Sequence, residues 1–265
     1  MDFIPYNFAL SVCQVLTTNH PVTVTPFWGR ASKKTKKTQL KLSITFASKT
    51  GLTSFTVQMR DGTRDHFYWA ELQKHPMPWT EYEFRKISVA QMHPVVSEYS
   101  PVLTKENFAL LTKILAMSTQ PAKLSLLEIT DQLPERVKFL IWTIPRIFFL
   151  DSKDNLTPEL TKMVYETMDR SALKTLSLGR IDLRPGLFGD LLRWMKVSKF
   201  ENLKIEMGVT SAVQPKTLVA KIGVALDEIR ANGLGDYEVR TAACGEFYTV
   251  WAIREGGSQE LKFWR

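Results

Sequence analysis

A repeated pattern in the second half of the chain places the strongest limit on what it can fold into. Between Arg146 and Asn232, short apolar segments recur, and each is followed by the apolar spacing of an amphipathic helix. Phe149, Leu176 and Leu203 follow one another at intervals of 27 residues. A period of about 20 to 29 residues is typical of strand-plus-helix solenoids such as leucine-rich repeats. We therefore expect parallel strands with helical crossovers, and leucines that face inward.

Turn and cap residues divide this half into elements. Thr157-Pro158, Pro185-Gly186 and Pro215 are typical helix starts, and Asn232-Gly233 is a typical helix end. We predict strands at residues 124–129, 147–150, 173–178 and 202–207, helices at 133–142 and after each of those starts, and a closing strand pair at 237–241 and 247–253.

In the first half of the chain, apolar residues recur with a different period, at every second position. Leu40, Leu42, Ile44 and Phe46 alternate with polar residues, which predicts a strand with a polar face of Lys41, Ser43 and Thr45. A second alternating run follows Gly51. The dipeptide Asp61-Gly62 is typical of a hairpin turn and leads into a further strand candidate at residues 66–69, and another strand is expected at 82–87. Residues 39–90 therefore predict a small antiparallel sheet of three or four strands, and residues 107–117 predict a helix.

These patterns predict an α/β protein: a small N-terminal antiparallel sheet followed by a leucine-rich-repeat-like stack. We expect four regions. They are an N-terminal helix at 1–18, a basic loop at 19–38, a β region at 39–100 and the repeat-like region at 101–265.

The net charge of +8 is concentrated in one stretch, because seven basic residues and no acidic one lie between Arg30 and Lys49. Such a local field favours anions, so one hypothesis is a nucleic-acid-binding protein. The alternative is a solvated loop. The candidate anion-binding residues are Arg30, Lys33, Lys34, Lys36, Lys37 and Lys41.

No catalytic, metal or cofactor motif stands out. The four histidines lie in separate segments without metal-ligand spacing, and Cys13 and Cys244 have no neighbouring cysteine or histidine ligand. We therefore expect no enzyme activity, no metal and no cofactor. The two cysteines, an acidic N-terminus and the lack of about 18 consecutive apolar residues favour a cytoplasmic or nuclear protein outside the membrane.

Two segments resemble a known family. The opening Met1-Asp2-Phe3-Ile4-Pro5-Tyr6-Asn7-Phe8, and residues 187–192 continued by 198–205, resemble the nematode-expanded F-box-like and F-box-associated (FTH/DUF-type) proteins. The resemblance implies that a remnant of the first F-box helix binds a ubiquitin-ligase adaptor and that the C-terminal region recognises substrate. The implied adaptor-binding residues are Pro5, Phe8, Val12 and Leu16. Residues 19–38 depart from the pattern, with prolines, threonines and lysines where two further F-box helices would lie.

Together these observations predict a non-enzymatic protein-interaction module. Stacked repeats create extended binding surfaces, so we expect the partner along the strand face or the exposed loops of the repeat.

Overall fold

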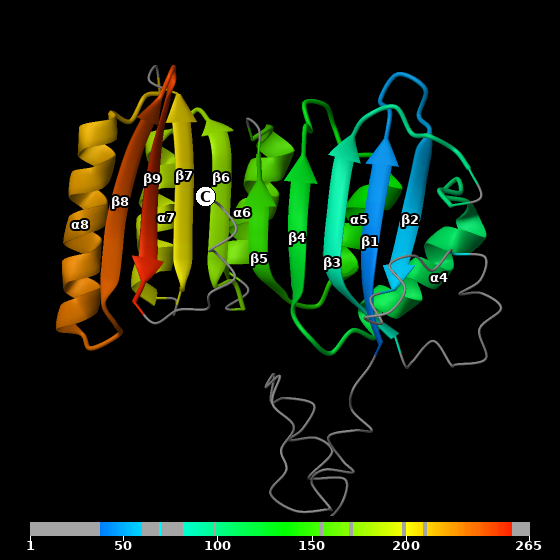
Figure 1. The fold of residues 1–265 in the computed structure, drawn as a ribbon, viewed down its shortest axis with the longest axis horizontal. Coiled ribbons are helices and arrows are strands. Elements are labelled where there is room, and N and C mark those ends of the chain that lie inside the picture. Colours follow the sequence, from blue (N-terminus) through cyan, green and yellow to red (C-terminus); the bar gives the residue numbers. More distant parts are fainter. Residues whose placement is uncertain are drawn as a thin grey trace, which may run out of the picture. The chain divides into compact units, whose positions relative to one another are not determined.

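The structure is a computed structural model that describes residues 38–59, 69, 82–97, 99–153, 156–169, 172–197, 200–208 and 211–255. It is an α/β protein, as predicted. Its described strands follow the order β2-β1-β3 in one part of the chain and β4-β5-β6-β7-β9-β8 in the other (Figure 1). The pairs β1–β2, β7–β9 and β8–β9 are antiparallel, and the pairs β5–β6 and β6–β7 are parallel. The chain divides into two compact units. The first contains β1, β2, most of β3, α4 and α5, and the second contains β4 to β9 and α6 to α8.

The first unit begins with the predicted hairpin. β1 (Thr38–Phe46) pairs antiparallel with β2 (Thr53–Met59), and Gly51 takes a left-handed conformation (φ +66°) in the turn. Alternation along β1 buries Leu40, Leu42, Ile44 and Phe46 and leaves Lys41 exposed and Ser43 and Thr45 half-buried. The predicted polar face of this strand is therefore confirmed.

The prediction of a wholly antiparallel sheet is wrong for β3 (Tyr82–Gln91). This strand lies beside β1 and runs in the same direction, whereas β2 runs in the opposite direction (Figure 1). The two parallel strands are not consecutive in the chain, because β2 runs between them and returns the chain to the end of the sheet at which both β1 and β3 begin (Figure 1). The other side of β2 is bordered by residues 101–103, where Leu103 N donates to Thr53 O at 2.8 Å.

Trp69, expected in a strand, is instead helical and buried. Its indole Nε1 donates to Asn107 Oδ1 at 2.9 Å, and its ring meets Phe55 edge-on at 5.1 Å. The proposed hairpin at Asp61-Gly62 lies outside the described residues.

Two helices complete the first unit. α4 (Lys105–Ala116) begins after Thr104, whose hydroxyl accepts from Asn107 N, and it buries Leu111, Ile114 and Leu115. α5 (Glu135–Thr143) packs beside α4, with Phe139 at 5.7 Å from Phe108 between ring centres. Both helices occur close to where the apolar spacing predicts them.

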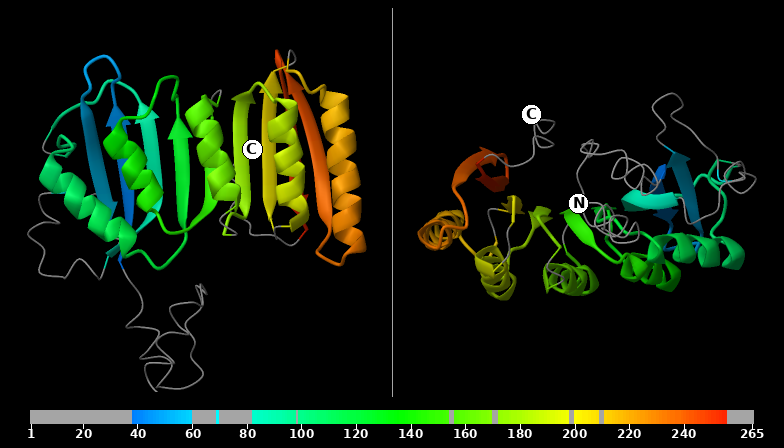
Figure 2. Two further views of the ribbon diagram at one scale, coloured as in Figure 1. Left: turned by 180° about the vertical axis from the view of Figure 1, so that it is seen from behind. Right: turned by 90° about the horizontal axis from the view of Figure 1, so that it is seen from below.

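The second unit alternates strands and helices in the predicted order. Its strands are β4 (Ala122–Leu127), β5 (Ile147–Ser152), β6 (Thr175–Ile181) and β7 (Asn202–Gly208), of which β5, β6 and β7 pair in parallel. α6 (Pro158–Asp169), α7 (Pro185–Val197) and α8 (Pro215–Ala231) each begin with proline and lie side by side on one face of these strands (Figure 2). β8 (Tyr237–Cys244) and β9 (Phe247–Arg254) form the predicted closing pair, with β9 antiparallel to β7.

Tyr237 fastens the start of β8 to the segment that precedes β7. Its hydroxyl donates to Phe200 O at 2.7 Å, and the two rings stack at 4.5 Å between centres. Burial is the largest cause that raises the pKa of Tyr237; the Arg254 guanidinium opposes this rise and the Glu201 carboxylate adds to it. The neutral phenol is therefore the form that the folded protein favours.

We expect Tyr237→Phe to weaken the pH dependence of stability in alkali. A raised pKa in the folded state contributes stability below the unfolded value of about 10, and this contribution is lost as pH rises through the folded value. Phenylalanine cannot ionise, so the variant should lose less stability than the wild type above about pH 10, although at pH 7 it should be about 1 kcal/mol less stable for want of the hydrogen bond. Urea unfolding across this pH range measures both effects, and parallel curves for the two proteins would contradict the assignment.

Candidate protein-interaction face

Strand register gives the second unit two chemically different faces. Paired residues on neighbouring strands point to the same side of a sheet, and successive residues point to opposite sides. Leu150, Leu176, Leu203 and Ala252 are in register across β5, β6, β7 and β9, and each is at most 2% exposed. This apolar row faces the helices.

The opposite side is the strand face. We define it by two rows in register: Phe149, Thr175, Asn202 and Ile253, and Asp151, Ser177, Lys204 and Trp251. Among the described segments, α6, α7 and α8 all lie on the other side of these strands (Figure 2). The strand face thus combines aromatic, charged and uncharged polar side chains, whereas the helix side is aliphatic.

The Phe149 side chain is on the strand face, contrary to prediction. The 27-residue spacing placed it in line with Leu176, but Phe149 pairs with Thr175, and Leu150 pairs with Leu176. The inward leucine row is therefore confirmed for β6 and β7 and begins one residue later in β5. The ammonium group of Lys123 lies 3.9 Å from the centre of the Phe149 ring.

Charges of both signs surround the centre of this face. Glu206 lies 3.6 Å from the Lys204 ammonium and 3.8 Å from the Arg180 guanidinium. On β8, Arg240 donates two hydrogen bonds of 2.7 Å to Glu238. The Arg240 hydrogen bond is the main reason why the pKa of Glu238 is below its ordinary range. The exposed rim can therefore meet a partner of mixed charge.

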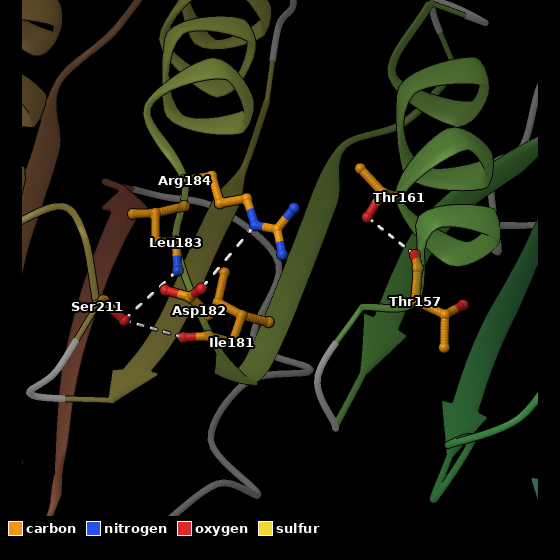
Figure 3. Close-up of polar contacts among 7 residues, drawn as sticks. All are labelled: Thr157, Thr161, Ile181, Asp182, Leu183, Arg184 and Ser211. Carbon is orange, nitrogen blue, oxygen red and sulfur yellow. Dashed lines mark hydrogen bonds and ion pairs between the residues drawn. The ribbon is translucent and has the colours of Figure 1, made fainter.

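The loops at the carboxyl ends of the strands are held by short polar contacts. The Ser211 hydroxyl lies 3.3 Å from Ile181 O and 3.4 Å from Leu183 N, so it joins the loop after β7 to the loop after β6 (Figure 3). Thr157 caps α6, since its hydroxyl accepts from Leu160 N at 3.2 Å. These contacts fix helix starts, and they bring no reactive side chains together.

Most residues proposed from the sequence for adaptor or anion binding lie outside the described residues. They are Pro5, Phe8, Val12, Leu16, Arg30, Lys33, Lys34, Lys36 and Lys37. Lys41 is described and is exposed on β1. Both assignments remain predictions.

The polar residues of the strand face were missed in the sequence. Asp151 follows the hydrophobic stretch of β5, and Asn202 begins β7, so in the sequence each resembles a strand boundary. The available signal was the alternation itself, because Asp151 and Asn202 fall at positions opposite in phase to the leucines.

No three His, Cys, Asp or Glu side chains in the described part of the chain form a group that could hold a metal ion. Cys244 is a free thiol on the exposed end of β8. No helix within the described ranges is long and apolar enough to cross a membrane. Comparison with protein-family models, curated protein sequences and solved structures finds no match to this chain.

Proposed function

We propose that this protein is a non-enzymatic protein-interaction module that binds its partner through the strand face. The observation that carries the proposal is the chemistry of this face, which differs from the aliphatic helix side of the same strands. Stacked strand-helix units offer extended surfaces of this kind for binding.

Trp251 is the strongest candidate anchor on the strand face. It is half-buried in β9, in register with Lys204, and the sheet backbone holds both residues in place. Tryptophan supplies a large apolar area with a polar N–H at its edge, and it is enriched among residues that dominate binding energy. Lys204 beside it lies in a region of mixed charge, which gives a partner orientation and selectivity.

The resemblance to F-box-associated proteins leads us to propose the partner's role as well. In that case the strand face recognises a substrate, and the N-terminal residues Pro5, Phe8, Val12 and Leu16 bind a ubiquitin-ligase adaptor. Recovery of adaptor and cullin subunits with the full chain supports this role. Recovery of partners without adaptor and cullin subunits contradicts this role in a ubiquitin ligase, although the protein would still be a binding module.

Trp251→Ala is expected to abolish recovery of partners that bind the strand face. Loss of an anchoring tryptophan costs about 2 kcal/mol or more, which lowers affinity by at least about 30-fold. The measurement is affinity purification from the native source with quantitative mass spectrometry, using the wild type, Trp251→Ala and Val224→Ser. Val224 is 59% exposed on α8, so its replacement is a matched control on the helix side.

Partners that bind the wild type and Val224→Ser, but not Trp251→Ala, support the proposal. Lys204→Glu, which changes charge on the strand face without removing an aromatic side chain, must reduce the same partners. If Trp251→Ala and Lys204→Glu recover these partners as well as the wild type does, the result contradicts the proposal. The comparison requires that both variants have the thermal midpoint of the wild type. Turnover of a substrate by the purified chain would contradict it as well.

A further inference from the structure

The centre of the strand face contains four polar side chains that are almost completely buried. We call them the polar strip: Asp151 is 4% exposed, Asn202 6%, Thr175 7% and Ser177 9%. They lie on three adjacent strands, with Asp151 beside Ser177 and Thr175 beside Asn202. Among the polar atoms of these four side chains, Asn202 Oδ1 is the one that is wholly inaccessible and has no hydrogen-bond donor within the described part of the chain.

Such a strip works against the stability of the free protein. A buried carboxylate or amide oxygen gives up its water and needs a donor in exchange. On the other side of the same strands, the buried positions are filled by leucines, which need no hydrogen-bond partner. Groups that cost stability are expected where they serve binding, because a ligand can supply the missing donors.

The chemistry of the strip selects a ligand rich in N–H donors. A carboxylate only accepts hydrogen bonds, Asn202 offers an unpaired carbonyl oxygen, and the two hydroxyls can accept as well as donate. The single charge, on Asp151, calls for a cation. An ammonium or guanidinium group provides both the charge and several donors.

The geometry selects an extended ligand. Asp151 is on β5 and Asn202 is on β7, with β6 between them, so two strand spacings of about 4.8 Å each separate them laterally. One cationic group cannot reach both positions. An extended polypeptide advances about 3.3 Å per residue, so about three residues cross this distance.

We propose that the polar strip binds an extended segment of a partner protein, with an arginine or lysine side chain at Asp151 and an N–H donor at Asn202 Oδ1. This inference rests on the proposed function and specifies the partner for the strand face. Thr175 and Ser177 lie between the two positions and provide hydroxyl groups for the main chain of the segment.

The probe is the tripeptide acetyl-Ser-Arg-Ser-amide, compared with the same peptide carrying citrulline in place of arginine. Citrulline keeps the size of arginine and removes its charge. Titrations followed by NMR of the full chain should show the arginine peptide binding at least about tenfold more tightly, with shifts at Asp151, Ser177 and Asn202. Equal affinity for the two peptides overturns the proposal.

Asp151→Asn should remove this preference for arginine. Asp182→Asn makes the same chemical change at an exposed loop position and should leave the preference intact. In the free protein, Asp151→Asn should raise the thermal midpoint by about 2 °C or more, because it replaces the carboxylate of a side chain that is 4% exposed with a neutral amide, whereas Asp182→Asn should not. A fall in the midpoint, or an unchanged preference for arginine, shows that Asp151 serves the fold and overturns the proposal.

Two further measurements separate the possible failures. If Trp251→Ala loses partners while Asp151→Asn keeps them, the strand face binds a partner but the polar strip does not select a basic side chain. A chain ending at Glu255 repeats the titration, because residues 256–265 contain Lys262 and Arg265, which offer the same chemistry. An affinity that rises at least tenfold on this truncation assigns the strip to the chain's own C-terminal segment and overturns the partner assignment.

Discussion

Leu176→Ala is expected to lower the free energy of unfolding by about 3 kcal/mol. Leu176 is 0% exposed on β6 and lies in register between Leu150 and Leu203, so its side chain belongs to the row that faces the helices. Truncation of a buried leucine costs about 2 to 5 kcal/mol through lost burial and the cavity that remains. Urea unfolding at pH 7, followed by circular dichroism, measures the change.

Ser177→Ala is the matched control for this prediction. Ser177 is the next residue along β6, it is also buried, and its hydroxyl forms no hydrogen bond within the described part of the chain. Replacement should therefore change the free energy of unfolding by no more than about 0.5 kcal/mol in the destabilising direction. Similar losses in both variants would show that the two faces have been assigned incorrectly.

The element order of the second unit was readable from the sequence because local chemistry decides it. Proline at the first helical position is compatible with α6, α7 and α8, since an N–H there has no intrahelical acceptor. Asn232 and Gly233 end α8 as predicted, and Gly233 has a φ of +67°. Such signals act over a few residues and need no knowledge of the partners in space.

Strand register was harder to predict from the sequence, and it determines which residues lie on the candidate site. The interval from Leu176 to Leu203 matches their pairing, but the interval from Phe149 to Leu176 is one residue too long. Since side chains alternate along a strand, this offset moves Phe149 to the opposite face and brings Asp151 with it. An average period could not reveal a shift of one residue, and for this reason the polar strip was not predicted.

Contacts between distant segments set the remaining differences. β3 is parallel to β1. The alternation of apolar and polar residues within β3 does not indicate whether the neighbouring strand is parallel or antiparallel. At the end of β6, Arg180 takes a positive φ of 53° and the register with β7 shifts. The Arg180 side chain lies 3.8 Å from Glu206 on β7, and its guanidinium lies 5.7 Å from the centre of the Phe247 ring on β9. Its residue type gave no sign of the conformation, because positive φ values favour glycine.

Phe200→Ala is expected to have the largest effect on stability, about 3 to 5 kcal/mol. Phe200 is 0% exposed between the end of α7 and the start of β7. Its ring stacks on Tyr237 and lies 5.4 Å from the Trp194 ring between centres, so the aromatic cluster joins α7, β7 and β8. Aromatic pairs of this kind add about 0.5 to 1.5 kcal/mol each beyond the burial of their area.

Phe200→Leu separates the aromatic contribution from simple burial. Leucine keeps most of the apolar volume and leaves the main-chain carbonyl that accepts the Tyr237 hydroxyl, so this variant should lose about half as much stability as Phe200→Ala. The double variant Phe200→Ala with Tyr237→Ala should lose less than the two single changes together, since both remove the same ring contact. Additive losses would mean that Phe200 and Tyr237 stabilise β7 and β8 independently, and the cluster would then not be what holds the closing strand pair to the parallel sheet.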